Sequence, residues 1–168
     1  ADLFSLTKPR ITLMVLITSG AGFLLGSAGD VDIRALVVSS FGIWLVASGT
    51  SALNQVIERD IDARMHRTRG RALPTGRVTP AAATWFSVGL AALGVGILAA
   101  FVNAIKALLA VVALLSYILV YTPMKRVSSL STLVGAVPGA LPILGGWTAA
   151  TGSMDPGGWA LFGILFFW

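Results

Sequence analysis

Three oxygen-bearing side chains follow one another at intervals of four residues: Asn54, Glu58 and Asp62. On a helix each step of four residues turns about 400° and rises about 6 Å, so the three side chains would drift by only about 40° per step. They would form one polar stripe, whereas Asp60 would point to another face. Two carboxylates and an amide offer the hard oxygen ligands that Mg²⁺ prefers, often shared with a substrate phosphate. The spacing therefore indicates a candidate catalytic and metal site.

Arginines crowd the segment that follows this stripe. Residues 54–77 hold three of the seven acids of the chain and six of its twelve lysines and arginines. Five of these arginines come after the stripe or at its end: Arg64, Arg67, Arg69, Arg71 and Arg77. Guanidinium groups bind phosphate oxygens through paired hydrogen bonds. An acidic stripe beside an arginine-rich loop suits a diphosphate with its Mg²⁺.

A second basic pair, Lys125 and Arg126, follows Tyr121 and could reach the same phosphate. The acidic stripe, the arginine-rich segment and the Lys125–Arg126 pair also have an explanation that involves no substrate. The acids could pair with neighbouring arginines at a solvated helix end, and the cations could serve only to orient the chain and to contact anionic lipids. Six arginines between residues 59 and 77 exceed what orientation needs, so the pattern favours a phosphate site without excluding this alternative.

The chain that carries these residues has the composition of a membrane protein. Hydrophobic residues make up 56% of its 168 residues and charged residues only 11%, and its mean hydropathy is +0.87. A soluble domain carries about 25% charged residues. The net charge of +5 does not indicate nucleic-acid binding, because the basic residues lie at the ends of apolar runs. Without cysteine, the chain has no disulfides and no thiolate chemistry.

Five apolar runs are long enough to cross a bilayer, which needs about 20 residues per helix. We expect them at residues 11–29, 35–53, 82–102, 104–121 and 130–150, with a sixth run from near Gly158 to Trp168. Lys8 and Arg10 precede the first run, but no cleavage site follows it, which argues against a signal peptide. The sequence predicts an all-α polytopic membrane protein with a single transmembrane helical domain over residues 1–168.

The lysines and arginines of the connecting segments predict the orientation. With the N-terminus inside, the inner segments 1–10, 54–80 and 121–129 carry ten of these residues, and the outer segments carry only Arg34 and Lys106. We therefore expect the N-terminus and the loop 54–80, which carries the acidic stripe, to face the cytoplasm of a bacterial inner membrane or the matrix of a mitochondrion.

Small residues and prolines mark the expected helix contacts. Gly22 and Gly26 are four residues apart, as are Gly135 and Gly139, and this spacing lets membrane helices approach closely. Two prolines between residues 135 and 147 predict an irregular fifth span. The only histidine, His66, lies among arginines, so we expect it to be a solvated loop residue.

Four stretches of the chain together resemble the UbiA superfamily of intramembrane prenyltransferases. NQVIERDIDARMHRTRGRALPTGR at 54–77 resembles its first Asp-rich motif, N-x-x-x-[DE]-x-x-x-D. Further segments of one branch of the superfamily, whose members farnesylate haem, are similar to LTKPRI at 6–11, YTPMKR at 121–126 and GAVPGALPILGGW at 135–147. The Asn-Gln start, the central Glu58 and the string M-x-R-T-R-x-R-x-L-P-x-G-R resemble the branch whose members farnesylate haem.

The resemblance implies a UbiA-type helical bundle and assigns roles to individual residues. Asn54, Glu58 and Asp62 would form the Mg²⁺–diphosphate site. Further contacts to the diphosphate would come from Arg67, Arg71, Tyr121, Lys125 and Arg126. Ala72 stands where the branch usually has proline. The chain ends at Trp168, so we expect it to be the N-terminal five to six of about nine helices, without the second Asp-rich motif.

The implied reaction transfers a farnesyl group from farnesyl diphosphate to a vinyl group of haem B, which makes haem O. Its expected cofactor is Mg²⁺, and its expected partners are the two substrates, the lipid bilayer and a haem A synthase or an oxidase assembly protein. Three alternatives remain open. They are a UbiA-type enzyme with an aromatic acceptor such as 4-hydroxybenzoate, a transporter, and a non-catalytic assembly subunit.

Overall fold

The computed structural model describes residues 2–168, and every regular element among these residues is a helix. The elements are α1 (Asp2–Leu6), α2 (Pro9–Gly26), α3 (Ile33–Arg64), α4 (Pro80–Phe101), α5 (Ala104–Leu115), η1 (Ser116–Tyr121), α6 (Thr122–Met124), α7 (Ser131–Thr151) and α8 (Pro156–Phe167). Five helical stretches are long and apolar enough to cross a membrane, with α5, η1 and α6 running on as one of them. The five predicted spans are therefore confirmed.

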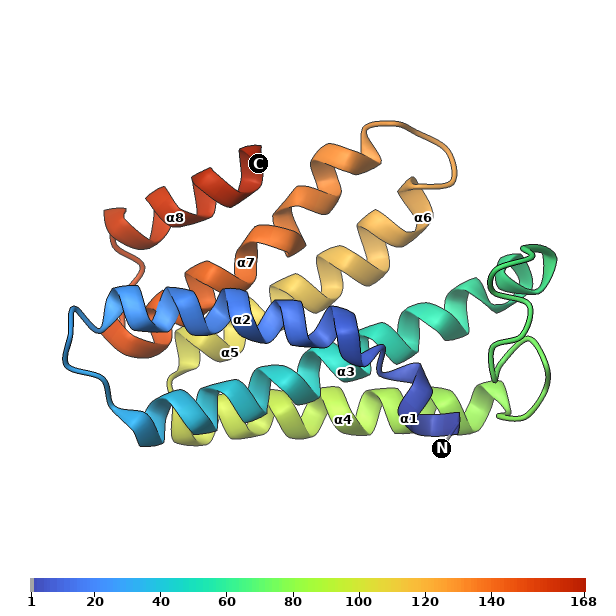
Figure 1. Ribbon diagram of the computed structural model, residues 1–168, viewed down its shortest axis with the longest axis horizontal. Coiled ribbons are helices and arrows are strands. Elements are labelled where there is room, and N and C mark those ends of the chain that lie inside the picture. Colours follow the sequence, from blue (N-terminus) through green and yellow to red (C-terminus); the bar gives the residue numbers. More distant parts are fainter. Residues whose placement is uncertain (1) are drawn as a thin grey trace.

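The long helices run alternately up and down the bundle (Figure 1). One end, which we call the charged end, contains α1, the loop 65–79 and the loop 125–130. The opposite end contains the three short connections at 27–32, 102–103 and 152–155. Because every second connection returns to the charged end, residues far apart in sequence meet there.

Helix α3 is longer than the span predicted from hydropathy. It continues through the acidic stripe to Arg64, so only residues 65–79 of the segment 54–80 form a loop. This loop packs on the bundle, because Ala72, Leu73 and Val78 are buried in one cluster with Leu6 of α1. The cluster holds the loop against the end of α3.

Helices α2 and α7 pack backbone to backbone through glycine, as the spacing of Gly22 and Gly26 predicted. A Cβ on Gly22 would collide with the backbone carbonyl of Ile143, and a Cβ on Gly146 would collide with that of Ser19. Gly26 lies against Trp147. Without side chains in the way, the two helices approach closely enough to gain van der Waals contact along their length.

The second glycine pair behaves differently from the prediction. Gly135 rests against the ring of Tyr121, but a Cβ on Gly139 would meet nothing within 4 Å. Helix α7 remains helical across Pro138 and Pro142. Gly139 and both prolines line a cavity described below, so this face of α7 borders open space instead of a neighbouring helix.

The position of Lys106 also differs from what the sequence led us to expect. We counted it as an outer connecting residue, but it lies in the first turn of α5 and is 1% exposed. Its Nζ donates a hydrogen bond to Oγ of Ser19 on α2 at 2.8 Å. A long side chain can turn inward at a helix end, which counting charges along the sequence does not reveal.

Candidate active site

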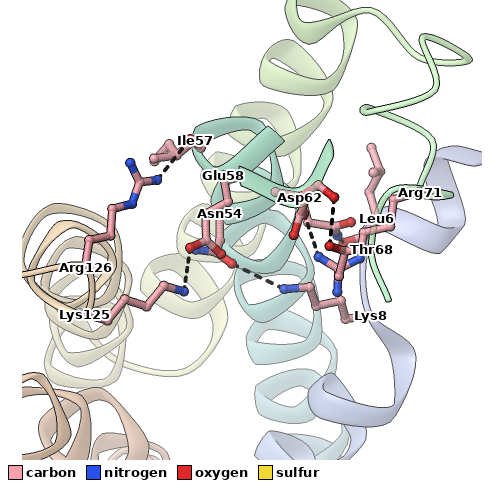
Figure 2. Close-up of polar contacts among 11 residues, drawn as sticks. Leu6, Lys8, Asn54, Ile57, Glu58, Asp62, Thr68, Arg71, Lys125 and Arg126 are labelled. Carbon is pink, nitrogen blue, oxygen red and sulfur yellow. Dashed lines mark hydrogen bonds and ion pairs between the residues drawn. The ribbon is translucent and has the colours of Figure 1, made fainter. Parts of the chain in front are cut away.

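The stripe on α3 lines a cavity of about 380 Å³ at the charged end, which we call the charged cavity. Asn54 and Asp62 are 1% and 5% exposed, and the side chain of Glu58 is 14% exposed. Figure 2 shows their polar groups together with the basic side chains that meet them from other elements. The charged residues lining the cavity are Lys8, Glu58, Asp62, Arg67, Arg71, Lys125 and Arg126. The helical spacing of four thus brings the three predicted oxygen ligands to one cavity.

Asp62 connects α3 to the arginine-rich loop. Its Oδ2 accepts a hydrogen bond from Nη1 of Arg71 at 2.6 Å, and its backbone carbonyl accepts one from Oγ1 of Thr68 at 2.9 Å. Because Asp62 is buried, the charge of Arg71 stabilises a carboxylate that would otherwise be costly to bury. The ion pair places one of the three predicted diphosphate-binding arginines at the cavity wall.

Glu58 connects α3 to the second basic pair. Its Oε1 lies 2.7 Å from Nζ of Lys125, which also lies 5.4 Å from the centroid of the Tyr121 ring. Arg126 donates from Nη2 to the backbone carbonyl of Ile57 at 3.3 Å. The structure therefore brings Lys125 and Arg126 to the acidic stripe, about seventy residues away in sequence, as the topology predicted.

Asn54 meets two residues that the site prediction did not include. Its Oδ1 accepts a hydrogen bond from Nζ of Lys8 at 3.3 Å, and its Nδ2 donates one to Oγ1 of Thr122 at 3.1 Å. One usable signal for Lys8 was present in the sequence, because LTKPRI was already part of the family resemblance. Thr122 had the same signal, since YTPMKR was also part of the resemblance, but a threonine in an apolar helix is usually bonded only to its own backbone, so nothing indicated a contact with Asn54.

The segment before α2 holds Lys8 in place. Nε2 of Gln55 donates to the backbone carbonyl of Leu6 at 2.7 Å, and Oγ1 of Thr12 donates to that of Thr7 at 2.8 Å. Lys8 itself has a left-handed backbone, with φ of 47°, directly before α2. Such a conformation costs on the order of 1 kcal/mol in a non-glycine residue, so its surroundings must enforce it.

Burial lowers the pKa of Lys8 below its ordinary value of 10.5, and the positive charge of Arg71 lowers it further. The carboxylates of Glu58 and Asp62 act in the opposite direction. The amino group of Lys8 is thus partly desolvated at the cavity wall. Its electric field is less screened there than it would be at an exposed surface.

The remaining charged residues of this region are exposed to solvent. Arg67 lines the charged cavity and is otherwise exposed. Arg77 pairs with Asp2 at 3.2 Å and donates to the carbonyl of Gly70. His66 is exposed, as expected for a solvated loop residue. Asp60 pairs with its neighbour Arg59 on another face of α3, with its side chain 79% exposed, which confirms that it lies off the stripe.

A second cavity of about 430 Å³ adjoins the charged one and extends between α2, α3, α5 and α7. Its walls are mainly apolar, with Val15, Ile43, Val46 and Leu114 among them, so we call it the apolar cavity. Lys8 and Tyr117 line both cavities. Tyr121, which we expected at the diphosphate, lines the apolar cavity, and its ring packs on that of Tyr117 with centroids 5.1 Å apart.

The oxygen atoms of the stripe suit a hard cation. Among residues 2–168 there is no group of three or more His, Cys, Asp or Glu side chains that could hold a metal ion. The stripe offers two carboxylates and one carboxamide facing a cavity. Mg²⁺ binds through one or two carboxylates and fills its remaining positions with water and substrate phosphate, so this donor set fits it.

The chain resembles known proteins both in sequence and in fold. It is 48% identical over 167 residues to the protoheme IX farnesyltransferase of Anaeromyxobacter dehalogenans (strain 2CP-C), covering 99% of this chain and 56% of the relative. The same enzyme of Salinibacter ruber (strain DSM 13855 / M31) is 47% identical over 99% of this chain and 59% of its own length. The chain therefore spans somewhat more than half the length of these relatives.

Two solved structures share the fold at low sequence identity. A digeranylgeranylglyceryl phosphate synthase superposes with a TM-score of 0.85 at 22% identity, over 98% of this chain and 57% of that one. A UbiA homologue from Archaeoglobus fulgidus bound to DMAPP and Mg²⁺ superposes with a TM-score of 0.83 at 19% identity, over 99% and 59%. The model of the UbiA prenyltransferase family matches residues 15–168. With five apolar helices and this match along most of its length, the chain is an integral membrane protein that belongs to the UbiA prenyltransferase family.

Proposed function

We propose that the protein transfers a farnesyl group from farnesyl diphosphate to a vinyl group of haem B, which gives haem O. One observation carries the prenyl-transfer part of this proposal: a charged cavity and an apolar cavity meet at Lys8 and Tyr117. A prenyl diphosphate has the same two parts, a multiply charged head and a long apolar tail. The choice of farnesyl and haem rests on the relatives called protoheme IX farnesyltransferase.

The charged cavity has the charge balance that a diphosphate needs. Five cations and two carboxylates line it, and both carboxylates already pair with a cation. Arg67, Arg71, Lys125 and Arg126 would bind the diphosphate oxygens, and Lys8 would join them from the start of α2. Asn54, Glu58 and Asp62 would hold Mg²⁺. When bound, this ion would neutralise part of the negative charge on the leaving diphosphate.

The position of Lys8 and Tyr117 suggests where the carbon–oxygen bond breaks. With the head in the charged cavity and the tail in the apolar one, C1 of the farnesyl group lies beside these two residues. As the bond breaks, the electron pair stays on the diphosphate oxygen, and the ammonium group of Lys8 stabilises that charge. The faces of Tyr117 and Tyr121 stabilise the allylic cation that remains.

The cation then reacts with the acceptor. The π-electrons of a haem vinyl group form the new carbon–carbon bond, which moves the positive charge to the vinyl carbon next to the ring. A water molecule adds there and loses a proton, which leaves a hydroxyethylfarnesyl side chain. The apolar cavity excludes water from the farnesyl cation before the vinyl group reacts with it.

We also propose that the charged end faces the cytoplasm or the mitochondrial matrix in an inner membrane. The distribution of lysine and arginine supports this orientation. The product would pass to a haem A synthase or an oxidase assembly protein. An aromatic acceptor such as 4-hydroxybenzoate remains the alternative substrate. A transporter is disfavoured because the acids of the stripe gather at one end of the bundle.

The test uses the full-length protein in proteoliposomes, supplied with haem B, farnesyl diphosphate, Mg²⁺ and an equal concentration of 4-hydroxybenzoate. Mass spectrometry follows both acceptors for wild type, Asp62→Asn and the control Asp60→Asn. We expect farnesylated, hydrated haem from wild type and from Asp60→Asn only. A prenylated benzoate would overturn the proposal that haem B is the acceptor. A folded protein that modifies neither compound would overturn the proposal that the protein is a prenyltransferase.

A further inference from the structure

The hydroxyl group of Thr122 joins Asn54 to the backbone of the helix that carries the second basic pair. Both residues are buried, with Thr122 0% and Asn54 1% exposed. Nδ2 of Asn54 donates to Oγ1 of Thr122 at 3.1 Å, and Oγ1 of Thr122 lies 2.8 Å from the backbone carbonyl of Tyr117. The carboxamide of the stripe is therefore fixed by a residue that lines neither cavity.

Only one assignment of donors and acceptors is possible for the hydrogen bonds that link Asn54, Thr122 and Tyr117. A hydroxyl group has a single proton, and a backbone carbonyl can only accept. The proton of Thr122 must therefore go to Tyr117, which leaves a lone pair of Oγ1 facing Asn54. Only the NH₂ end of the carboxamide can donate to that lone pair, so its oxygen must face the other way.

Lys8 requires the same orientation from the opposite side. Its Nζ lies 3.3 Å from Oδ1 of Asn54, and an ammonium group can only donate. If the carboxamide were flipped, its NH₂ group would face Lys8, and its oxygen would face a hydroxyl lone pair. Two unfavourable contacts would replace two hydrogen bonds at a buried site, where unmade bonds are most costly.

The local backbone explains why Thr122 can make this contact. Pro123 has no backbone N–H, so the regular helical bond pattern cannot continue through it. The preceding segment Ser116–Tyr121 is a π-helix, in which the N–H of Thr122 bonds to the carbonyl of Tyr117, five residues back. The same carbonyl accepts the hydroxyl proton. Such single wide turns within a helix occur frequently at functional sites.

We propose that Thr122 is a positioning residue that aims the carboxamide oxygen of Asn54 into the charged cavity, where it acts as the neutral oxygen ligand of the metal–diphosphate site. The inference rests on the function proposed above. It also gives a role to the π-helix, because the Tyr117 carbonyl of its wide turn accepts the hydroxyl proton of Thr122 and leaves a lone pair for Asn54.

The experiment measures metal affinity directly, with Mn²⁺ as the probe for Mg²⁺ and farnesyl thiodiphosphate present as an unreactive substrate analogue. Electron paramagnetic resonance gives the Mn²⁺ affinity of the full-length protein in detergent. Loss of a residue that orients a metal ligand typically lowers affinity roughly 10–100-fold, which we expect for Thr122→Val. Thr122→Ser keeps the hydroxyl group and should stay within about twofold of wild type.

The same Thr122 substitution, made in an Asn54→Asp protein, distinguishes a loss of carboxamide orientation from general damage to the structure. In Asn54→Asp both terminal atoms are oxygens, so no orienting contact is needed for an oxygen to face the cavity. We therefore expect Thr122→Val to change Mn²⁺ affinity by no more than about twofold in that background. A purely structural role of Thr122 would produce the same loss in both backgrounds. Thr122→Ala replaces Thr122→Val in the comparison if the valine variant does not fold.

Equal Mn²⁺ affinity of wild type and folded Thr122→Val would overturn the inference and leave the proposed function standing. Equal losses in the wild-type and Asn54→Asp backgrounds would overturn it as well. If the wild-type protein itself bound no Mn²⁺ in the presence of the analogue, the metal site of the proposed function would be wrong, and the inference would fail with it.

Discussion

Two lysines at opposite ends of the bundle, one buried and one half-buried, show how a candidate site differs from a structural contact. Lys106 is 1% exposed between α2, α5 and α7, where its Nζ donates to the hydroxyl group of Ser19. Lys8 is half-buried at the charged end, where its Nζ donates to the carboxamide of Asn54. Both side chains cross between helices, and both bond to a neutral oxygen.

The difference between the two lysines lies in access and in neighbouring charge. Lys8 lines both cavities, and the carboxylates of Glu58 and Asp62 lie near enough to affect its pKa. Lys106 lines neither of the two cavities, and it forms no ion pair with the described residues. A cation can bind a phosphate only where the phosphate can enter, so burial alone does not mark a lysine as functional.

The largest expected effect is at the centre of the charged end. Asp62→Asn should lower kcat of the full-length enzyme roughly 10²–10³-fold, because in the proposed mechanism it removes a carboxylate that would hold Mg²⁺ beside the leaving diphosphate. It also leaves Arg71 without its partner. Asp60→Asn makes the same chemical change at an exposed position on the same helix and should leave kcat unchanged. Equal losses in both variants would show that the stripe has no special role.

The comparison of the two lysines is tested by the same substitution at both. Lys8→Met should lower kcat/KM for farnesyl diphosphate by roughly 100-fold, because a preorganised donor to the developing charge is lost. Lys106→Met keeps the length of the side chain at a distant position, so activity should stay within about twofold of wild type. Steady-state kinetics in proteoliposomes give both values. A larger loss for Lys106→Met would mean that the opposite end takes part in the reaction.

The next largest effect concerns the close contact of α2 and α7, which pack against each other through glycine. Gly146→Ala places a methyl group against the carbonyl of Ser19 and should destabilise the bundle by about 1–3 kcal/mol. Gly20→Ala, where a Cβ meets nothing within 4 Å, is the matched control and should not destabilise it. Thermal unfolding in detergent compares them. An unchanged midpoint for Gly146→Ala would contradict the close packing.

The smallest effect concerns the rim of the charged cavity. Arg67→Ala should raise KM for farnesyl diphosphate about 3- to 10-fold, because Arg67 lines the cavity yet is largely exposed to solvent. Arg69→Ala removes the same charge from the same loop at a position outside the cavity wall. It should leave KM close to the wild-type value. If both variants behaved alike, the loop would attract substrate by its overall charge only.

Much of this architecture could be predicted from the sequence because it depends on local patterns. Runs of apolar residues predicted five spans, and a spacing of four predicted that Asn54, Glu58 and Asp62 share a face. The family motif indicated the fold, since a resemblance in four places leaves few alternatives. The roles proposed for the individual site residues stay predictions until they are tested.

The topology predicted that Lys125 and Arg126 would lie at the same end as the stripe, but the other contacts between distant segments could not be predicted in this way. The positive-inside count treated Lys8 as an inner and Lys106 as an outer charge of the connecting segments, and it did not show that one faces a cavity while the other is sealed between helices. Tyr121 was expected at the diphosphate, and it lines the apolar cavity from a segment that is a π-helix. A hydropathy plot contains no information about such a turn.

Local patterns along the chain are enough to establish that it crosses a membrane several times and carries an acid stripe beside a basic loop. Those properties follow from composition and from helical periodicity, which act over a few residues. The packing of the helices settles which cations meet the stripe, which way the carboxamide of Asn54 points, and where the two cavities join. These features depend on Lys8 and Thr122, 46 and 68 residues away from Asn54, and no local pattern brings such distant residues together.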